Sequence, residues 1–150
     1  MAEERGSEAG SFDDLAERLG LALVPVMRQL RRQGDAPVPT GSLSALAALD
    51  RHGQMTAGEL ARYEHVTGPM VTRMAKLLEE EGLITRSQSP EDGRVALLRP
   101  TAKGRRLVHS RRQAKNEWLT EQLAALDPDD LSVLAAVIPV FERLSGRDAP

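Results

Sequence analysis

Apolar residues of this 150-residue chain recur at helical spacing in its first third. Apolar side chains at three- and four-residue steps predict a helix from about Phe12 to about Gln33. A second helix is predicted from about Ser42 to about His52, with Gly53 as its stop. The chain therefore opens with helices whose apolar faces need partners.

Two shorter helices are predicted next. Thr56 and Glu59 have the T-x-x-E form of a capping box, which starts a helix over 56–63. Thr67 is predicted to cap a following helix over 67–81, which Gly82 ends. Two short helices joined by a tight turn form a helix-turn-helix, and the second is the recognition helix.

The polar face of the predicted recognition helix has chemistry suited to DNA. Pro69, Thr72, Arg73 and Lys76 fall at i, i+3, i+4 and i+7, so they share one stripe opposite the apolar residues. Arginine reads guanine bidentately, and threonine contacts a base edge or a phosphate. The alternative is a solvated helix face that carries these cations without reading DNA.

After Gly82 the pattern changes to that of strands. Short apolar runs at 83–86 and 95–98 are separated by a segment whose Asp92-Gly93 pair is a hairpin-turn signal. A hairpin directly after a recognition helix is a wing, and it brings Arg94 to the phosphate backbone or a minor groove. The alternative for Arg94 is a surface ion pair with Asp92 or Glu91.

Charge is distributed unevenly along the chain, although its formal net charge is only −2. Residues 83–115 contain nine Lys and Arg against two acidic residues, whereas both ends of the chain are acidic. This asymmetry is typical of a polyanion-binding face. A solvated basic helix face is the alternative explanation.

Several classes of protein are disfavoured. The chain has no cysteine, which removes disulfides and thiol redox sensing. Its three histidines lie far apart, and no catalytic, phosphate-binding or dinucleotide motif occurs, so we expect no metal, no cofactor and no enzyme activity. Residues 1–11 are predicted to be a disordered tail without a signal or membrane anchor, which predicts a soluble cytoplasmic protein.

The C-terminal third predicts an oligomer. Thr101 is predicted to cap a long helix that reaches about Leu126, and Asp127 caps the last helix. That last helix carries two apolar stripes, which are Leu131, Leu134, Ile138 and Phe141, and Val133, Val137, Val140 and Leu144. One stripe is expected to face its own chain and the other a second copy in a two-fold dimer. The alternative is an ordinary buried core helix.

Together these residues resemble a known family. The segment GELARYEHVTGPMVTRMAKLLEEEGLITRSQSPEDGRVALLRPTAKG is similar to the DNA-binding core of the MarR family, including its D-x-R wing signature at Asp92 and Arg94. The family usually has leucine where this chain has Pro100, and since proline lacks an N–H we expect the final strand to end one residue early. The residues expected to contact DNA are Thr67, Pro69, Met70, Thr72, Arg73, Lys76, Arg86, Asp92 and Arg94.

The resemblance implies a mainly α fold with a small β-hairpin wing (α+β), a winged helix-turn-helix flanked by N- and C-terminal dimerisation helices. Residues 12–40 and 101–150 are expected to dimerise, and 41–100 to bind DNA. The implied function is a ligand-responsive repressor that binds a pseudo-palindromic operator as a homodimer. It also implies a cavity for a small aromatic or lipophilic effector, whose lining the sequence does not identify. The alternative is a winged-helix dimer that acts as a protein-interaction or architectural module without an effector.

Overall fold

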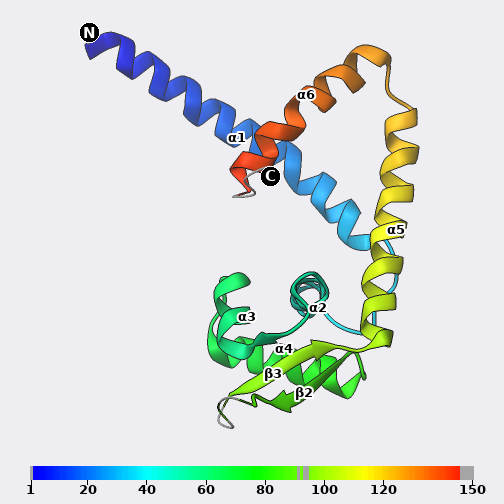
Figure 1. The fold of residues 1–150 in the computed structure, drawn as a ribbon. Helices are drawn as coiled ribbons and strands as arrows, with labels where there is room; N and C mark the ends of the chain where they lie inside the picture. The colour runs from blue at the N-terminus through cyan, green and yellow to red at the C-terminus, as the bar shows by residue number, and fades with distance from the viewer. Residues whose placement is uncertain (1, 91, 93–94, 146–150) are drawn as a thin grey trace. The chain divides into compact units, whose positions relative to one another are not determined.

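The computed structural model describes residues 2–90, 92 and 95–145 (Figure 1). Its helices are α1 (Ala2–Arg32), α2 (Thr40–His52), α3 (Ala57–Tyr63), α4 (Gly68–Glu80), α5 (Ala102–Ala124) and α6 (Pro128–Leu144). Its strands are β1 (Met55–Thr56), β2 (Ile84–Gln88) and β3 (Ala96–Pro100). The fold is thus mainly helical with a small antiparallel sheet, as the sequence predicts.

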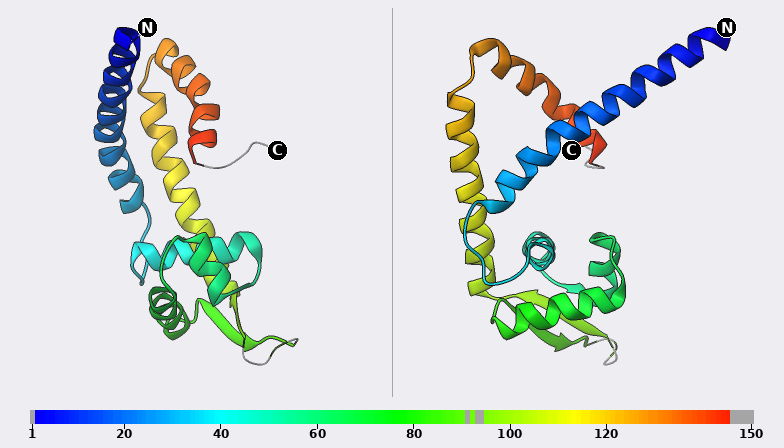
Figure 2. Two further views of the ribbon diagram at one scale, coloured as in Figure 1. Left: turned by 90° about the vertical axis from the view of Figure 1, so that its left-hand side faces the viewer. Right: turned by 180° about the vertical axis from the view of Figure 1, so that it is seen from behind.

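The chain forms two compact units, residues 1–114 and 115–150. The segment from α2 to β3 lies wholly in the first unit, where α2, α3 and α4 gather around the β2–β3 hairpin (Figure 2). The end of the hairpin that carries Gln88 and Ala96 points away from the start of α5. This arrangement is that of a winged helix.

Helix α1 begins earlier than predicted. The sequence predicts a disordered tail over residues 1–11 and a helix start near Phe12, whereas α1 begins at Ala2. Residues 2–9 include two Ala, three Glu and one Arg, which have high helix propensity, so the helix extends back to Ala2. Its carboxyl end, Arg32, falls one residue before the predicted Gln33.

The hydrophobic core lies inside the winged helix, between its helices and its sheet. Leu46 and Leu49 of α2, Leu78 of α4 and Leu98 of β3 are almost completely buried. The other buried apolar side chains are Val38, Ala45, Ala48, Met55, Leu60, Val71, Ala75, Leu83, Ile84 and Val108. Because α2, α4 and the sheet share this core, the orientation of α4 is fixed by packing.

The sheet contains a strand that the sequence did not reveal. Strand β1 pairs antiparallel with β3, which also pairs with β2, so the order is β1-β3-β2. At two residues, β1 is too short to produce an alternating hydrophobic pattern. It extends the predicted hairpin to a three-stranded sheet.

The expectation that β3 ends before Pro100 is wrong, because Pro100 is paired with Ile84. The Thr101 N–H donates to the Leu83 carbonyl at 2.9 Å, which makes 83 and 101 a hydrogen-bonded pair. Pairs alternate along an antiparallel ladder, so Ile84 and Pro100 form a non-hydrogen-bonded pair. No ladder bond needs the missing N–H of proline there.

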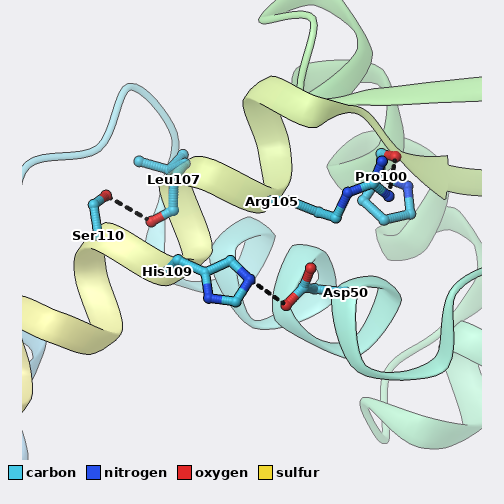
Figure 3. Close-up of polar contacts among 6 residues, drawn as sticks. All are labelled: Asp50, Pro100, Arg105, Leu107, His109 and Ser110. Carbon is cyan, nitrogen blue, oxygen red and sulfur yellow. Dashed lines mark hydrogen bonds and ion pairs between the residues drawn. The ribbon is translucent and has the colours of Figure 1, made fainter.

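The start of α5 packs closely against the winged helix. A Cβ built on Gly104 would overlap the Leu83 carbonyl oxygen. Figure 3 shows two further contacts of this helix: the Arg105 guanidinium donates to the Pro100 carbonyl at 3.1 Å, and His109 Nε2 lies 3.8 Å from Asp50 Oδ2 of α2. Close packing and polar contacts therefore hold α5 to β3 and α2.

A buried arginine joins α5 to α1. The Arg111 guanidinium donates to the Arg31 carbonyl at 3.1 Å and to the Gly34 carbonyl. Gly34 has φ +75°, and a Cβ added there would lie 3.3 Å from Cγ of Arg111. A cation at the carboxyl end of α1 interacts favourably with the helix dipole, so Arg111 also stabilises the end of that helix.

Helix α6 presents apolar side chains to solvent. Its start is as predicted, since the Asp127 carboxylate accepts a hydrogen bond from the Asp130 N–H at 2.9 Å. No described side chain of α6 is buried, and Ile138 is 56% exposed. Within the second unit neither stripe is fully covered, and the expectation that one stripe faces the rest of its own chain stays a prediction. The second unit holds only α6 and the end of α5, too few elements to enclose two faces.

Candidate nucleic-acid interface

The helix-turn-helix consists of α3, a turn over 64–67 and α4. Its first helix starts with the predicted capping box, in which the Thr56 N–H donates to Glu59 Oε2 at 2.7 Å and the Glu59 N–H donates to Thr56 Oγ1 at 3.1 Å. In the turn, His65 has φ 53°, a left-handed conformation that is uncommon for residues other than glycine. This turn redirects the chain into α4.

The capping box has a titratable member. The backbone hydrogen bond from Thr56, followed by the bond with its side chain, lowers the pKa of the Glu59 carboxyl. Because the pKa of Glu59 is lowered in the folded state, its ionised carboxylate stabilises the fold. This stabilisation is fully present above the unfolded-state pKa and is lost as the pH falls through the folded-state pKa.

We expect Thr56→Ala to raise the pKa of Glu59 toward its usual value, because it removes the Thr56 side chain and loosens the cap that holds the Thr56 N–H on the carboxylate. The substitution should also cost about 1 kcal/mol of stability. An NMR pH titration of the glutamate side chains measures the pKa, with Thr120→Ala on α5 as the control. An unchanged Glu59 pKa would show that the capping box does not set it.

Helix α4 separates its apolar and polar residues as the sequence predicts. Val71, Ala75 and Leu78 are buried against the core. The exposed predicted contact residues of α4 and its N-cap are Thr67, Pro69, Met70, Thr72, Arg73 and Lys76. The structure thus brings these six predicted residues to the solvent face of one helix.

The polar side chains on α4 differ in the hydrogen bonds and ion pairs that they make within the chain. Thr67 is the N-cap as predicted, but its hydroxyl makes no capping hydrogen bond. The Thr72 hydroxyl donates to the Gly68 carbonyl at 3.1 Å, and Lys76 Nζ lies 3.8 Å from Glu80 Oε1. Arg73 has no hydrogen bond or ion pair within the described residues. Its guanidinium is therefore the α4 cation most available to an external anion.

Of the wing, the structure describes both strands and Asp92 at the turn. Arg86 on β2 lies 3.9 Å from Glu79 of α4, measured from Nε to Oε2, so it is partly held by the recognition helix. The Asp92 carbonyl accepts a hydrogen bond from the Val95 N–H at 2.9 Å, and its side chain is exposed. Arg94 lies outside the described residues, so its contact with a minor groove and its support by Asp92 stay predictions.

Part of the basic block has a structural role that the sequence did not indicate. Arg99 donates to Gln54 Oε1 at 2.6 Å and Lys103 donates to the Glu81 carbonyl at 2.6 Å. Arg105 and Arg111 also donate to backbone carbonyls. These four cations stabilise the fold, so the block is not simply a surface for a polyanion. Only their partners in the fold distinguish them, and for Arg99, Lys103 and Arg111 those partners lie 22 or more residues away in the sequence.

Other kinds of site find no support in the described ranges. No group of three or more histidine and acidic side chains there could hold a metal ion. None of the helices in those ranges has the length and apolarity to cross a bilayer.

Comparison with known proteins agrees with this geometry. The model of the MarR family matches residues 40–96, the segment from α2 to the start of β3. An uncharacterized HTH-type transcriptional regulator of Mycobacterium bovis is 40% identical over 131 residues, which cover 87% of this chain and 92% of that protein.

Solved structures share the fold. A putative transcriptional regulator of Pseudomonas aeruginosa is 31% identical, with a TM-score of 0.78 over 90% of this chain and 96% of that one. A mutant MarR from E. coli complexed with operator DNA has a TM-score of 0.65 at 19% identity, over 85% of this chain and 93% of that one. The chain therefore belongs to the MarR family of HTH-type transcriptional regulators and is not an enzyme.

Proposed function

We propose that this regulator binds a pseudo-palindromic operator as a homodimer, with α4 of each subunit in a major groove, and that it acts as a ligand-responsive repressor. The observation that carries the proposal is the exposed stripe on α4, where Arg73 is uncommitted beside three small or hydroxyl-bearing neighbours, Thr67, Pro69 and Thr72. A helix of this kind fits a major groove, and a free guanidinium matches the O6 and N7 acceptors of guanine. Operator binding requires access to chromosomal DNA, so the proposal includes a cytoplasmic location.

The wing completes the proposed DNA contact. Arg86 and Asp92 belong to the hairpin, whose tip also includes Arg94 in the sequence. We assign Arg94 to the minor groove, where a narrow and electronegative groove attracts a guanidinium, and Asp92 to orienting it. Residues 41–100 then form the DNA-binding part.

Dimerisation is supported by exposed apolar side chains. Phe12, Leu15 and Leu21 of α1 and Val133, Ile138 and Leu144 of α6 are all more than half exposed within one chain. Two helices with such faces bury them when a second copy supplies the same surfaces about a two-fold axis. We therefore assign 12–40 and 101–150 to dimerisation.

An effector-independent role is the alternative. A ligand-responsive repressor loses operator affinity when a small aromatic or lipophilic compound binds, since that compound must prefer one of two conformations. An architectural or protein-interaction module shows no such response and binds random duplexes nearly as well as any selected one. Selection of bound fragments from random DNA supplies the operator needed for the comparison.

We expect Arg73→Ala to weaken operator binding by roughly 1–3 kcal/mol per subunit and to change which bases are preferred. Arg94→Ala should weaken binding to all duplexes and shallow the salt slope by about one per subunit. Fluorescence anisotropy on operator and random duplexes at two salt concentrations measures both effects.

Arg18→Ala on α1 is the matched control, because Arg18 is exposed and its one ion pair within the described residues joins it to Asp14 at 3.6 Å. It removes the same charge outside residues 41–100, and because α1 is assigned to dimerisation the variant serves as a control once sedimentation shows the same oligomeric state as the wild type. If Arg73→Ala retained the affinity and base preference of the Arg18→Ala protein, α4 would not read the operator through this side chain.

A further inference from the structure

Three successive backbone carbonyls after α4 accept hydrogen bonds from the first turn of α5. Lys103 Nζ donates to the Glu81 carbonyl at 2.6 Å, and the Thr101 hydroxyl donates to the Gly82 carbonyl at 2.8 Å. The Thr101 N–H donates to the Leu83 carbonyl at 2.9 Å. We call residues 81–83 and 101–104 the α4–α5 junction.

The carbonyls of the junction are those that α4 cannot satisfy by itself. The Gly82 N–H donates to the Glu79 carbonyl at 2.9 Å and the Leu83 N–H to the Leu78 carbonyl at 2.8 Å, while Gly82 has φ +66°. These two bonds form a Schellman motif, which ends α4 and satisfies its carbonyls at 78 and 79. The next carbonyls depend on donors from another element, and α5 provides them.

Packing and charge reinforce these hydrogen bonds. The Thr101 hydroxyl also accepts a bond from the Gly104 N–H at 3.0 Å, so one side chain caps α5 and binds the end of α4. Gly104 lies so close to Leu83 that no Cβ fits between them. The ammonium of Lys103 sits at the carboxyl end of α4, where the helix dipole favours a cation. The end of α4 and the start of α5 therefore behave as one rigid piece.

Helix α5 holds a second helix end in the same way. Arg111 donates to the carbonyls of Arg31 and Gly34 at the end of α1, eight positions after Lys103 in the same helix. Through Lys103 and Arg111, helix α5 is therefore hydrogen-bonded to the carboxyl ends of both α4 and α1. These contacts join α5 to α4 through hydrogen bonds and not only through the connecting chain.

We propose that Lys103 is a positioning residue for operator recognition, which fixes α4 to α5 and so sets the separation of the two recognition helices in the dimer. The proposal rests on the dimeric operator binding proposed above. Lys103 need not contact DNA for this role. It acts by keeping α4 at one position relative to the helix that leads toward residues 115–144, where apolar side chains are exposed.

The test compares Lys103→Met with Lys103→Arg and with Arg106→Met. Arginine at 103 can still donate to the Glu81 carbonyl, whereas methionine cannot. Arg106 is an exposed cation on α5 without a hydrogen bond or ion pair to any described residue, so Arg106→Met removes the same charge without loosening the junction. Each protein is titrated with three duplexes: a wild-type-selected operator, the same operator with one base pair inserted between half-sites, and a single half-site.

The wild type should prefer the selected spacing, and Lys103→Met should reduce this preference about fivefold, since one cation–dipole contact is lost in each of two subunits. Lys103→Arg and Arg106→Met should keep the wild-type preference. Binding to the single half-site should be the same for Lys103→Met and Arg106→Met.

The remaining outcomes distinguish failure of the positioning role from failure of the proposed dimeric binding. If Lys103→Met keeps the spacing preference of Arg106→Met, or weakens all three duplexes equally as a lost phosphate contact would, the positioning role is rejected while the dimeric function stands. If the wild type itself shows no spacing preference, operator binding by a dimer of fixed geometry is rejected, and the role of Lys103 with it.

Discussion

Gly104→Ala should lower the free energy of unfolding by about 1–3 kcal/mol, although glycine to alanine inside a helix normally stabilises. The added methyl would overlap the Leu83 carbonyl oxygen, which is backbone and cannot rotate away. It would also lie 3.1 Å from Cδ1 of Leu46, a side chain with no exposed surface. Relief requires α5 to move away from the core.

Urea denaturation of Gly104→Ala and Gly58→Ala measures this effect against a matched substitution. Gly58 lies in α3, and a Cβ there meets nothing within 4 Å, so its replacement should leave stability unchanged or raise it. Equal midpoints for the two variants would contradict the close approach of α5 to Leu83.

Ile138→Glu should convert the proposed dimer to a monomer and abolish tight operator binding. Ile138 is exposed in one chain, so the isolated chain tolerates the carboxylate, but a two-fold interface would bury two of them. We expect a loss of at least about 3 kcal/mol per dimer, roughly a hundredfold in its dissociation constant.

Sedimentation across a range of micromolar concentrations measures the change, with Ser132→Glu as the control. Ser132 is an exposed polar residue near the start of the same helix, where an added negative charge is favourable. A wild-type protein that sediments as a monomer would reject dimerisation through α6.

Local signals in the sequence predicted the parts of the fold that depend on neighbouring residues. The Thr56–Glu59 capping box, the stop at Gly82 and the cap at Asp127 all form as expected, because each needs only residues within one turn. The exposed face of α4 also follows from periodicity, since burial of Val71, Ala75 and Leu78 leaves Arg73 outside.

Features that depend on distant residues were not predictable in the same way. The role of Pro100 in β3 depends on which pairs of the ladder share hydrogen bonds, and the bond between Thr101 and Leu83 decides that. Lys103 and Arg111 read in sequence as part of a basic surface, yet their partners are carbonyls 22 and 77 residues or more away. Charge in a sequence does not indicate whether a cation faces solvent or a helix end.

The DNA contacts themselves are a separate case. The structure presents Thr67, Pro69, Met70, Thr72, Arg73 and Lys76 on one surface, but contact with bases requires the nucleic acid. Arg86 illustrates the difference, because within the described residues it forms an ion pair with Glu79 of α4. Sequence reasoning placed these side chains on one exposed face, and their contact with DNA stays a prediction.

Pro100 also avoids an unpaired donor inside the sheet, because β3 is the central strand and Pro100 is buried. Its pairing places the backbone nitrogen and carbonyl of residue 100 on the side away from β2, beyond the two residues of β1. That position offers no N–H, and its carbonyl already accepts the Arg105 guanidinium. Any other residue at this buried position would bring an N–H that has no ladder partner in β1 or β2, and an unpaired buried donor is costly.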